Sequence, residues 1–142
     1  MASAVPATVT IAGKKFQILF GANALRRLEK VSGYSVTAIG LMLVSGRGGY
    51  GLLQEAIWAG MEGARLKLNP QQPELSVEEV GDLIDDHDGG IVALCHSESE
   101  FTARFMEAWE SAFPTMRKDA PKTDPPTAAD APSQAPTSGG TT

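Results

Sequence analysis

Residues 9–20 read VTIAGKKFQILF, and this stretch decides how the fold begins. Residues 9–11 alternate between apolar and polar, Gly13 supplies a turn, and residues 16–20 are rich in aromatic and aliphatic side chains. Such a pattern predicts a β-hairpin. Two strands alone are marginally stable in water, so the hairpin must lie on helices or pair with another chain.

The free edge of this hairpin, within residues 8–20, is a place where a second copy of the chain could add a strand. We therefore expect a homo-oligomer. The candidate self-association residues are the apolar positions of the two arms: Val9, Ile11, Phe16 and Ile18.

Helical patterns follow the hairpin. Ser76 and Glu79 form a capping box at the start of one helix, and Gly60 interrupts the apolar stripe of another, where it allows a second backbone to come close. The sequence therefore predicts a mainly α fold, with an N-terminal β-hairpin followed by a small bundle of about five helices. Their expected ranges are 23–32, 37–44 (or from Ser35), 50–64, 77–86 and 91–113.

Composition divides the chain into three parts. Residues 114–142 contain no Leu, Ile, Val, Phe, Tyr or Trp, and five prolines fall between Pro121 and Pro136. Such a stretch has too little apolar surface to offset the entropy lost on ordering. We expect a flexible arm over 1–7, a folded domain over 8–113 and a disordered tail over 114–142.

Charge and residue usage exclude several classes of protein. The net charge is −5 and the acidic excess lies within residues 8–113, so nucleic acid is a poor candidate partner. No apolar stretch reaches the roughly 20 residues of a membrane span. The single cysteine, Cys95, excludes an internal disulfide and fits a reducing compartment. These features predict a cytoplasmic protein without membrane or nucleic-acid partners.

Residues 46–51 match the pattern G-x-G-x-x-G, which binds dinucleotide phosphates when it follows a buried parallel strand. Here the preceding run contains Leu41 and Met42 and starts from a helix cap, and no acidic residue lies about 20 positions further on. We interpret the segment as a joint between two helices, whose glycines let it adapt to a bound partner. No cofactor is predicted.

Residues with catalytic or metal-binding chemistry are few. His87, Cys95 and His96 lack the paired spacing of a zinc site, and Cys95 and His96 are neighbours on a predicted helix, about 100° apart. The acidic run 82–88 misses two oxygen ligands of a calcium-binding loop. We predict neither a metal site nor an enzyme.

An aromatic stripe on the last predicted helix, 91–113, has two interpretations. Apolar helix stripes usually pack on the body of their own domain. Alternatively, the end of this long helix extends beyond the bundle and presents its rings to another protein. The second interpretation makes four residues candidate partner contacts: Phe101, Phe105, Trp109 and Phe113.

Three segments, in this order and spacing, resemble a known family. They read FGANALRRLEKVSGYS (20–35), LLQEAIWAGMEG (52–63) and LSVEEVGDLIDD (75–86). They look like segments of the small tail assembly chaperones of siphophages and of gene transfer agents, a family loosely labelled tail tube protein. The resemblance covers roughly residues 8–113.

This resemblance implies a role in assembly. Chaperones of this family coat the long helical tape measure protein, keep it in solution, help to recruit tail tube subunits and then leave the particle. It implies that this protein acts in the cytoplasm of a bacterial host and is absent from the mature virion. Two alternatives are a structural tail component retained in the virion and a helical DNA-binding regulator that uses Arg26, Arg27 and Lys30.

Overall fold

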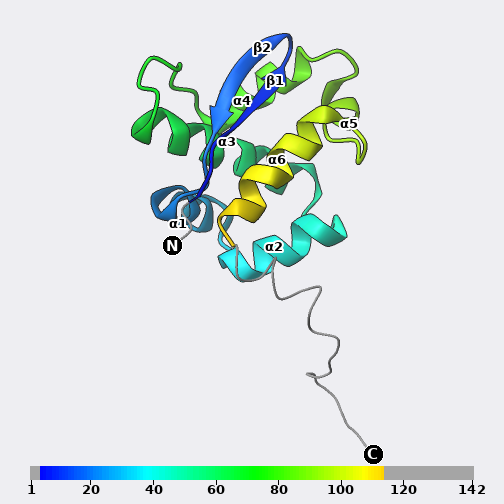
Figure 1. Cartoon of the computed structure of the whole chain (residues 1–142). Coiled ribbons are helices and arrows are strands. Elements are labelled where there is room, and N and C mark those ends of the chain that lie inside the picture. The colour runs from blue at the N-terminus through cyan, green and yellow to red at the C-terminus, as the bar shows by residue number, and fades with distance from the viewer. Residues whose placement is uncertain (1–3, 114–142) are drawn as a thin grey trace, which may run out of the picture. The chain divides into compact units, whose positions relative to one another are not determined.

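A computed structural model describes residues 4–113 of the protein. It confirms a mainly helical fold with an N-terminal hairpin (Figure 1). Residues 1–3 of the predicted arm and the tail predicted over 114–142 lie outside the described residues. The elements are β1 (Ala7–Ile11), β2 (Lys14–Ile18), α1 (Ala22–Ser32), α2 (Val36–Ser45), α3 (Gly49–Lys67), α4 (Val77–Asp85), α5 (Gly90–Leu94) and α6 (Glu100–Ser111).

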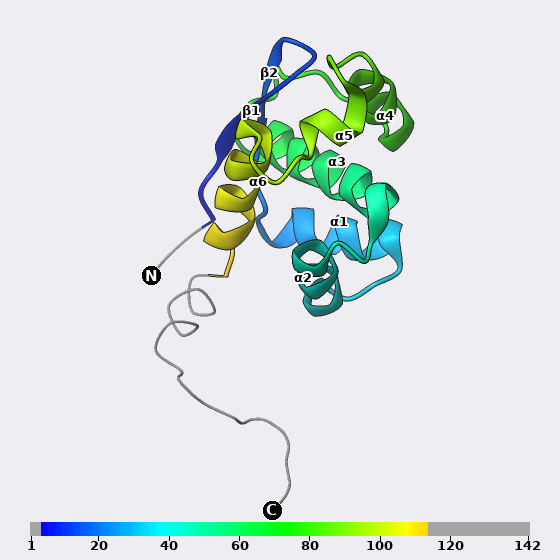
Figure 2. The ribbon, with the colours of Figure 1, turned by 90° about the vertical axis from the view of Figure 1, so that its right-hand side faces the viewer.

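The longest helix, α3, runs through the middle of the fold (Figures 1 and 2). Strand β2 and helices α1 and α4 pack on α3, while α6 packs along β1. The core therefore lies between the inner face of the hairpin, α3 and α6. Helix α2 contacts α1 and α3 only sparsely and lies at the edge of this arrangement.

The two strands form an antiparallel hairpin whose register pairs Val9 with Phe16. They are joined by Ala12 and Gly13, which both have positive φ angles, of 54° and 77°. Positive φ at both central residues is the mark of a type I′ turn, whose twist suits a hairpin. Alternate side chains are buried on the inner face: Ala7, Val9, Ile11, Phe16 and Ile18.

Two glycines let α3 approach the chain that leaves the hairpin. The N–H of Leu19 donates to the carbonyl of Gly60 over 2.9 Å. A Cβ at Gly60 would lie 2.9 Å from the Phe20 ring, and a Cβ at Gly63 would lie 2.3 Å from the Leu19 carbonyl oxygen. The predicted close approach of another backbone at Gly60 is thus confirmed.

The local signals at helix ends were largely correct. The capping box of Ser76 and Glu79 is present, and Ser35, one of the two candidates, caps α2. Asn23, a residue type that often caps helices, marked the expected start of α1, and this was wrong: Gly21 occupies the cap position and Asn23 lies inside the helix.

The prediction of one helix over 91–113 was also wrong, because the chain breaks between α5 and α6. The Ser99 hydroxyl accepts a hydrogen bond from the Thr102 N–H over 3.1 Å and donates to the Leu94 carbonyl over 2.6 Å. One serine therefore caps the start of α6 and satisfies a carbonyl at the end of α5. This competition with helical hydrogen bonds explains the break.

Candidate functional site

Helix α2 is the most exposed apolar element of the described chain. Residues 34–46 contain no charged side chain. Only Ile39 of this helix is buried, whereas Leu41 and Val44 are 68% and 79% exposed. A helix that is apolar on all sides is normally buried, so its exposure here makes α2 a candidate interaction surface.

An apolar groove of about 450 Å³ lies beside α2. Met42 and Leu43 form its α2 wall, and Phe101 and Phe105 contribute from α6. The remaining lining comes from the α2–α3 joint, the start of α3, the α5–α6 turn and α6: Gly46, Gly48, Gly49, Tyr50, Leu53, Cys95, Ser97, Thr102 and Met106. We call α2 and this groove together the α2 surface.

The segment 46–51 connects two helices, as predicted, but the joint itself is only 46–48, because α2 ends at Ser45 and α3 already begins at Gly49. Gly46 ends α2 with a φ of 75°, and Gly49 has a φ of 68°. Both angles fall in the left-handed region, which favours glycine. The glycines therefore shape one wall of the groove, and a helix stands where a dinucleotide site needs a strand.

Three of the four aromatic residues predicted to contact a partner are buried by the chain itself. Phe101, Phe105 and Trp109 are buried, and Phe113, the last described residue, is half-buried. The Phe20 ring meets Phe105 edge-on with centroids 5.4 Å apart, and meets Trp109 in the same way at 5.1 Å. This matches the first of the two interpretations, in which the stripe packs on the domain.

The candidate self-association residues are likewise core residues. Val9, Ile11, Phe16 and Ile18 are all buried on the inner face of the hairpin. Their side chains are therefore not accessible to a second copy. Any pairing through the hairpin would use the backbone at its edge.

Sequence reasoning missed the residues that make the α2 surface. It treated Leu41, Met42 and Leu43 only as the apolar content of a short helix before the glycine motif. The available signal was the absence of any charged residue between Tyr34 and Gly46. A small domain rarely covers such a helix on every side, because its core is limited.

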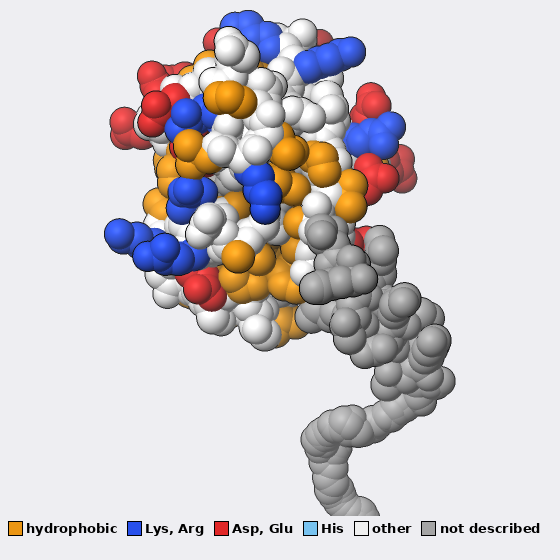
Figure 3. Space-filling view, turned by 60° about the vertical axis from the view of Figure 1, so that its left-hand side comes forward, with side chains coloured by type: hydrophobic (Ala, Val, Ile, Leu, Met, Phe, Trp, Pro, Cys, Tyr) orange, Lys and Arg blue, Asp and Glu red, His pale blue; other side chains and the backbone are white. Residues whose placement is uncertain are grey.

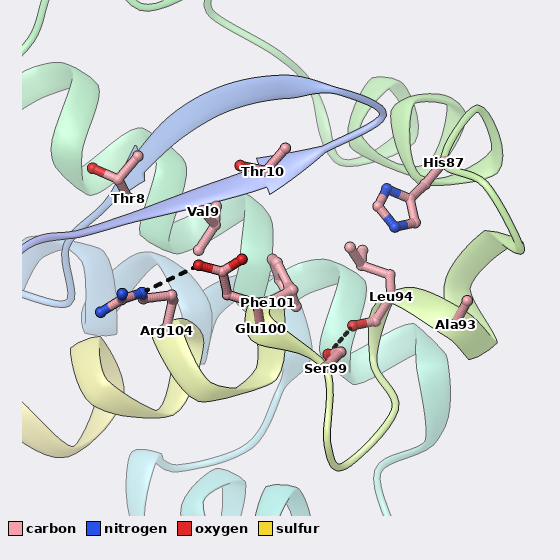
Figure 4. Close-up of a pocket in the computed structure, with 10 residues that line it drawn as sticks. All are labelled: Thr8, Val9, Thr10, His87, Ala93, Leu94, Ser99, Glu100, Phe101 and Arg104. Carbon is pink, nitrogen blue, oxygen red and sulfur yellow. Dashed lines mark hydrogen bonds and ion pairs between the residues drawn. The ribbon is translucent and has the colours of Figure 1, made fainter.

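A second cavity of about 260 Å³ lies between β1 and the first turns of α6 (Figure 4). A third hollow, of about 210 Å³, is surrounded by Asn23, Arg26, Arg27 and Lys30 on α1. Among residues 4–113 these three cations form no ion pair. Figure 3 shows the side of the molecule where α1 lies, with Lys and Arg side chains interspersed among hydrophobic ones.

Titratable groups are not gathered into a reactive cluster. Within the described residues, no three His, Cys, Asp or Glu side chains come together in a way that could hold a metal ion. The buried Glu62 is held by Arg65, whose Nη2 lies 2.8 Å from Glu62 Oε1. Burial raises the pKa of the Cys95 thiol to about 11, so this thiol is protonated at neutral pH.

We expect Cys95 to react slowly with iodoacetamide. At neutral pH the native thiol should be alkylated roughly two orders of magnitude more slowly than in the urea-unfolded chain, because only the thiolate is nucleophilic. The native rate should rise with pH until about pH 11, the pKa of the folded thiol. Mass spectrometry of the alkylated protein measures both rates. Equal rates in native and unfolded protein would contradict the burial of this thiol.

Comparisons with protein-family models, with curated proteins and with solved structures find no match to this chain. None of the helices within residues 4–113 has the length and apolar character required to cross a lipid bilayer.

Proposed function

We propose that this protein is a tail assembly chaperone that binds an apolar helical segment of a tape measure protein. The role comes from the resemblance of three sequence segments to that family. The observation that supports it is the α2 surface, in which an uncharged helix exposes Leu41 and Val44 beside an apolar groove.

The α2 surface suits a helical client. An amphipathic helix binds by laying its apolar face into a hydrophobic groove. Met42 and Met106 line the groove, and methionine side chains adapt to apolar surfaces of different shapes. The acidic body, with its net charge of −5, favours solubility of the resulting complex.

The site supports binding without chemistry. Its lining contains one thiol, Cys95, which is protonated at neutral pH, and no Asp, Glu, His, Lys or Arg. On this proposal the protein binds the tape measure in the cytoplasm of a bacterial host, helps to recruit tail tube protein and then leaves the particle.

Two measurements distinguish the proposed chaperone function from the two alternative functions. A component retained in the virion would appear in stoichiometric amounts in mass spectra of purified particles, where the chaperone is expected to be absent. Arg26, Arg27 and Lys30, which form no ion pair among residues 4–113, favour an anionic partner. Tight DNA binding at low salt would support a regulator.

The replacement Leu41→Glu tests the proposal. When a tape measure fragment is co-expressed, the wild-type chain should keep it in the soluble fraction, and L41E should lower the soluble amount about tenfold. Leu41 does not line the groove but lies on the exposed part of α2 next to Met42, so a charge there would have to be desolvated when an apolar helix covers the α2 surface. The L41E chain itself should melt like the wild type, because Leu41 is exposed.

Leu66→Glu is the matched control, because Leu66 is a leucine of similar exposure, 53%, at the far end of α3. The L66E variant should keep the fragment soluble. If L41E and L66E behave alike, or if the fragment precipitates with the wild-type chain, the proposal is wrong.

A further inference from the structure

The two edges of the hairpin differ. At the edge of β2, the Gln17 N–H donates to Gln72 Oε1 over 2.7 Å, and Gln72 Nε2 donates back to the Gln17 carbonyl over 3.1 Å. Gln72 is itself buried and also donates to the Met61 carbonyl. Its side-chain amide therefore takes the place of a neighbouring strand at Gln17 and blocks this edge at that position.

The same contacts reveal which backbone groups point outward from β1. Because Gln17 uses both backbone groups away from the ladder, its pair with Thr8 is one of the non-hydrogen-bonded pairs. These pairs alternate along an antiparallel ladder, so the N–H and C=O of Thr8 and Thr10 all point outward. Among residues 4–113, none of these four groups has a hydrogen-bond partner outside the ladder.

The open stretch of the β1 edge, Thr8 to Thr10, is bounded at both ends. Pro6, on one side, has no N–H to donate, and the Ala12 N–H, on the other, donates to His87 Nδ1 over 2.9 Å. Beside the open stretch lies the cavity of about 260 Å³ that Figure 4 shows. Leu94 and Phe101 line it, and Glu100 and Arg104 of α6 lie on its far side.

We propose that the open edge of β1 binds β1 of a second copy in antiparallel orientation. The sequence Thr8-Val9-Thr10 reads the same in both directions, so a two-fold axis at Val9 would place Thr8 of each copy opposite Thr10 of the other. Each Thr8–Thr10 pair would exchange two backbone hydrogen bonds, which gives four in total. Threonine pairs opposite one another also stabilise sheets.

The charges beside the edge have the same self-complementarity. In Figure 4, Arg104 lies toward the Thr8 end of the strand and Glu100 lies further toward the Thr10 end. A two-fold axis at Val9 would therefore bring Arg104 of one copy toward Glu100 of the other. Arg104 is 50% exposed and Glu100 is 84% exposed, and the ion pair between them is 3.9 Å long. Arg104 also pairs with Glu107 of α6 over 3.2 Å, and both of these exposed pairs can rearrange.

Amide hydrogen exchange at two protein concentrations tests this interface directly. The Thr8 and Thr10 amides should exchange fast in dilute protein and become protected at least about tenfold in concentrated protein. The exchange rate of the Lys15 amide should not change with concentration. Lys15 pairs with Thr10, so its backbone N–H points outward on the opposite edge of the hairpin, along β2. Sedimentation should show a monomer–dimer equilibrium over the same concentrations.

Charge variants provide the matched control. Arg104→Glu should weaken the dimer about tenfold, because two acidic pairs would then face each other across the axis. The double variant Glu100→Arg with Arg104→Glu restores opposite charges and should recover the dimer. Both positions are largely exposed, so the fold should be retained.

The β1 interface does not depend on client binding at the α2 surface, and either of the two proposals can fail while the other holds. Fast exchange of Thr8 and Thr10 at every concentration would overturn the proposed β1 interface, as would a dimer in which these amides stay unprotected. Protection that appears only after addition of the tape measure fragment would show that the edge binds a client strand, and this would also overturn it.

Discussion

Replacing Gly63 by alanine is expected to lower the free energy of unfolding by about 3 kcal/mol. The new Cβ would lie 2.3 Å from the Leu19 carbonyl oxygen and 2.8 Å from the Ala24 Cβ. The backbone at Leu19 cannot retreat freely, because its N–H is bound to the Gly60 carbonyl one turn away. Chemical denaturation followed by circular dichroism measures the loss.

Gly51→Ala is the control for this substitution, because Gly51 lies in the same helix and a Cβ there meets no atom within 4 Å. Alanine has the higher helix propensity, so this variant should gain about 0.5 kcal/mol. Opposite signs at the two positions would show that contact with the hairpin exit, and not helix propensity, governs Gly63. An unchanged free energy of unfolding in G63A would mean that α3 can move away from the chain at Leu19 without a loss of stability.

Replacing Phe105 by alanine is expected to cost about 4 kcal/mol, a large part of the stability of a small domain. Phe105 is buried and its ring lies 5.4 Å from that of Phe20 and 5.9 Å from that of Phe101. Its removal leaves a cavity at the point where the hairpin exit meets α6. Thermal melting and chemical denaturation should both record the loss.

Phe105→Leu keeps most of the volume and should cost only about 1.5 kcal/mol. Together the two variants separate the interpretations of the aromatic stripe. If F105A melts like the wild type but no longer retains a client, the ring contacts a partner. If it loses stability, as we expect, Phe105 belongs to the core and supports the groove from within.

Local features were predictable from the sequence because they depend on neighbours in the chain. The hairpin follows from residues 9–20, whose alternation and turn glycine act within a few positions. The capping box of Ser76 and Glu79 and the joint at 46–51 are equally local. The close contact at Gly60 was also expected, since glycine inside an apolar stripe indicates a near backbone.

The expectation of a single helix over 91–113 failed because a short-range competitor was overlooked. The apolar periodicity over 91–113 continues across the break, so periodicity alone could not detect it. Ser99 takes hydrogen bonds from the helical backbone and separates α5 from α6. This break shortens the last helix and lets Phe101, Phe105 and Trp109 fold onto the hairpin exit, where they are buried.

The sequence by itself determined a hairpin, the first four helices and the caps of α2 and α4, but not the division between α5 and α6. The tertiary structure alone decided which apolar side chains are covered. Both α2 and α6 are rich in apolar residues, but α6 lies against β1 while α2 lies at the edge of the fold. Burial depends on contacts between segments far apart in the chain, and no local pattern encodes which of two apolar helices receives them.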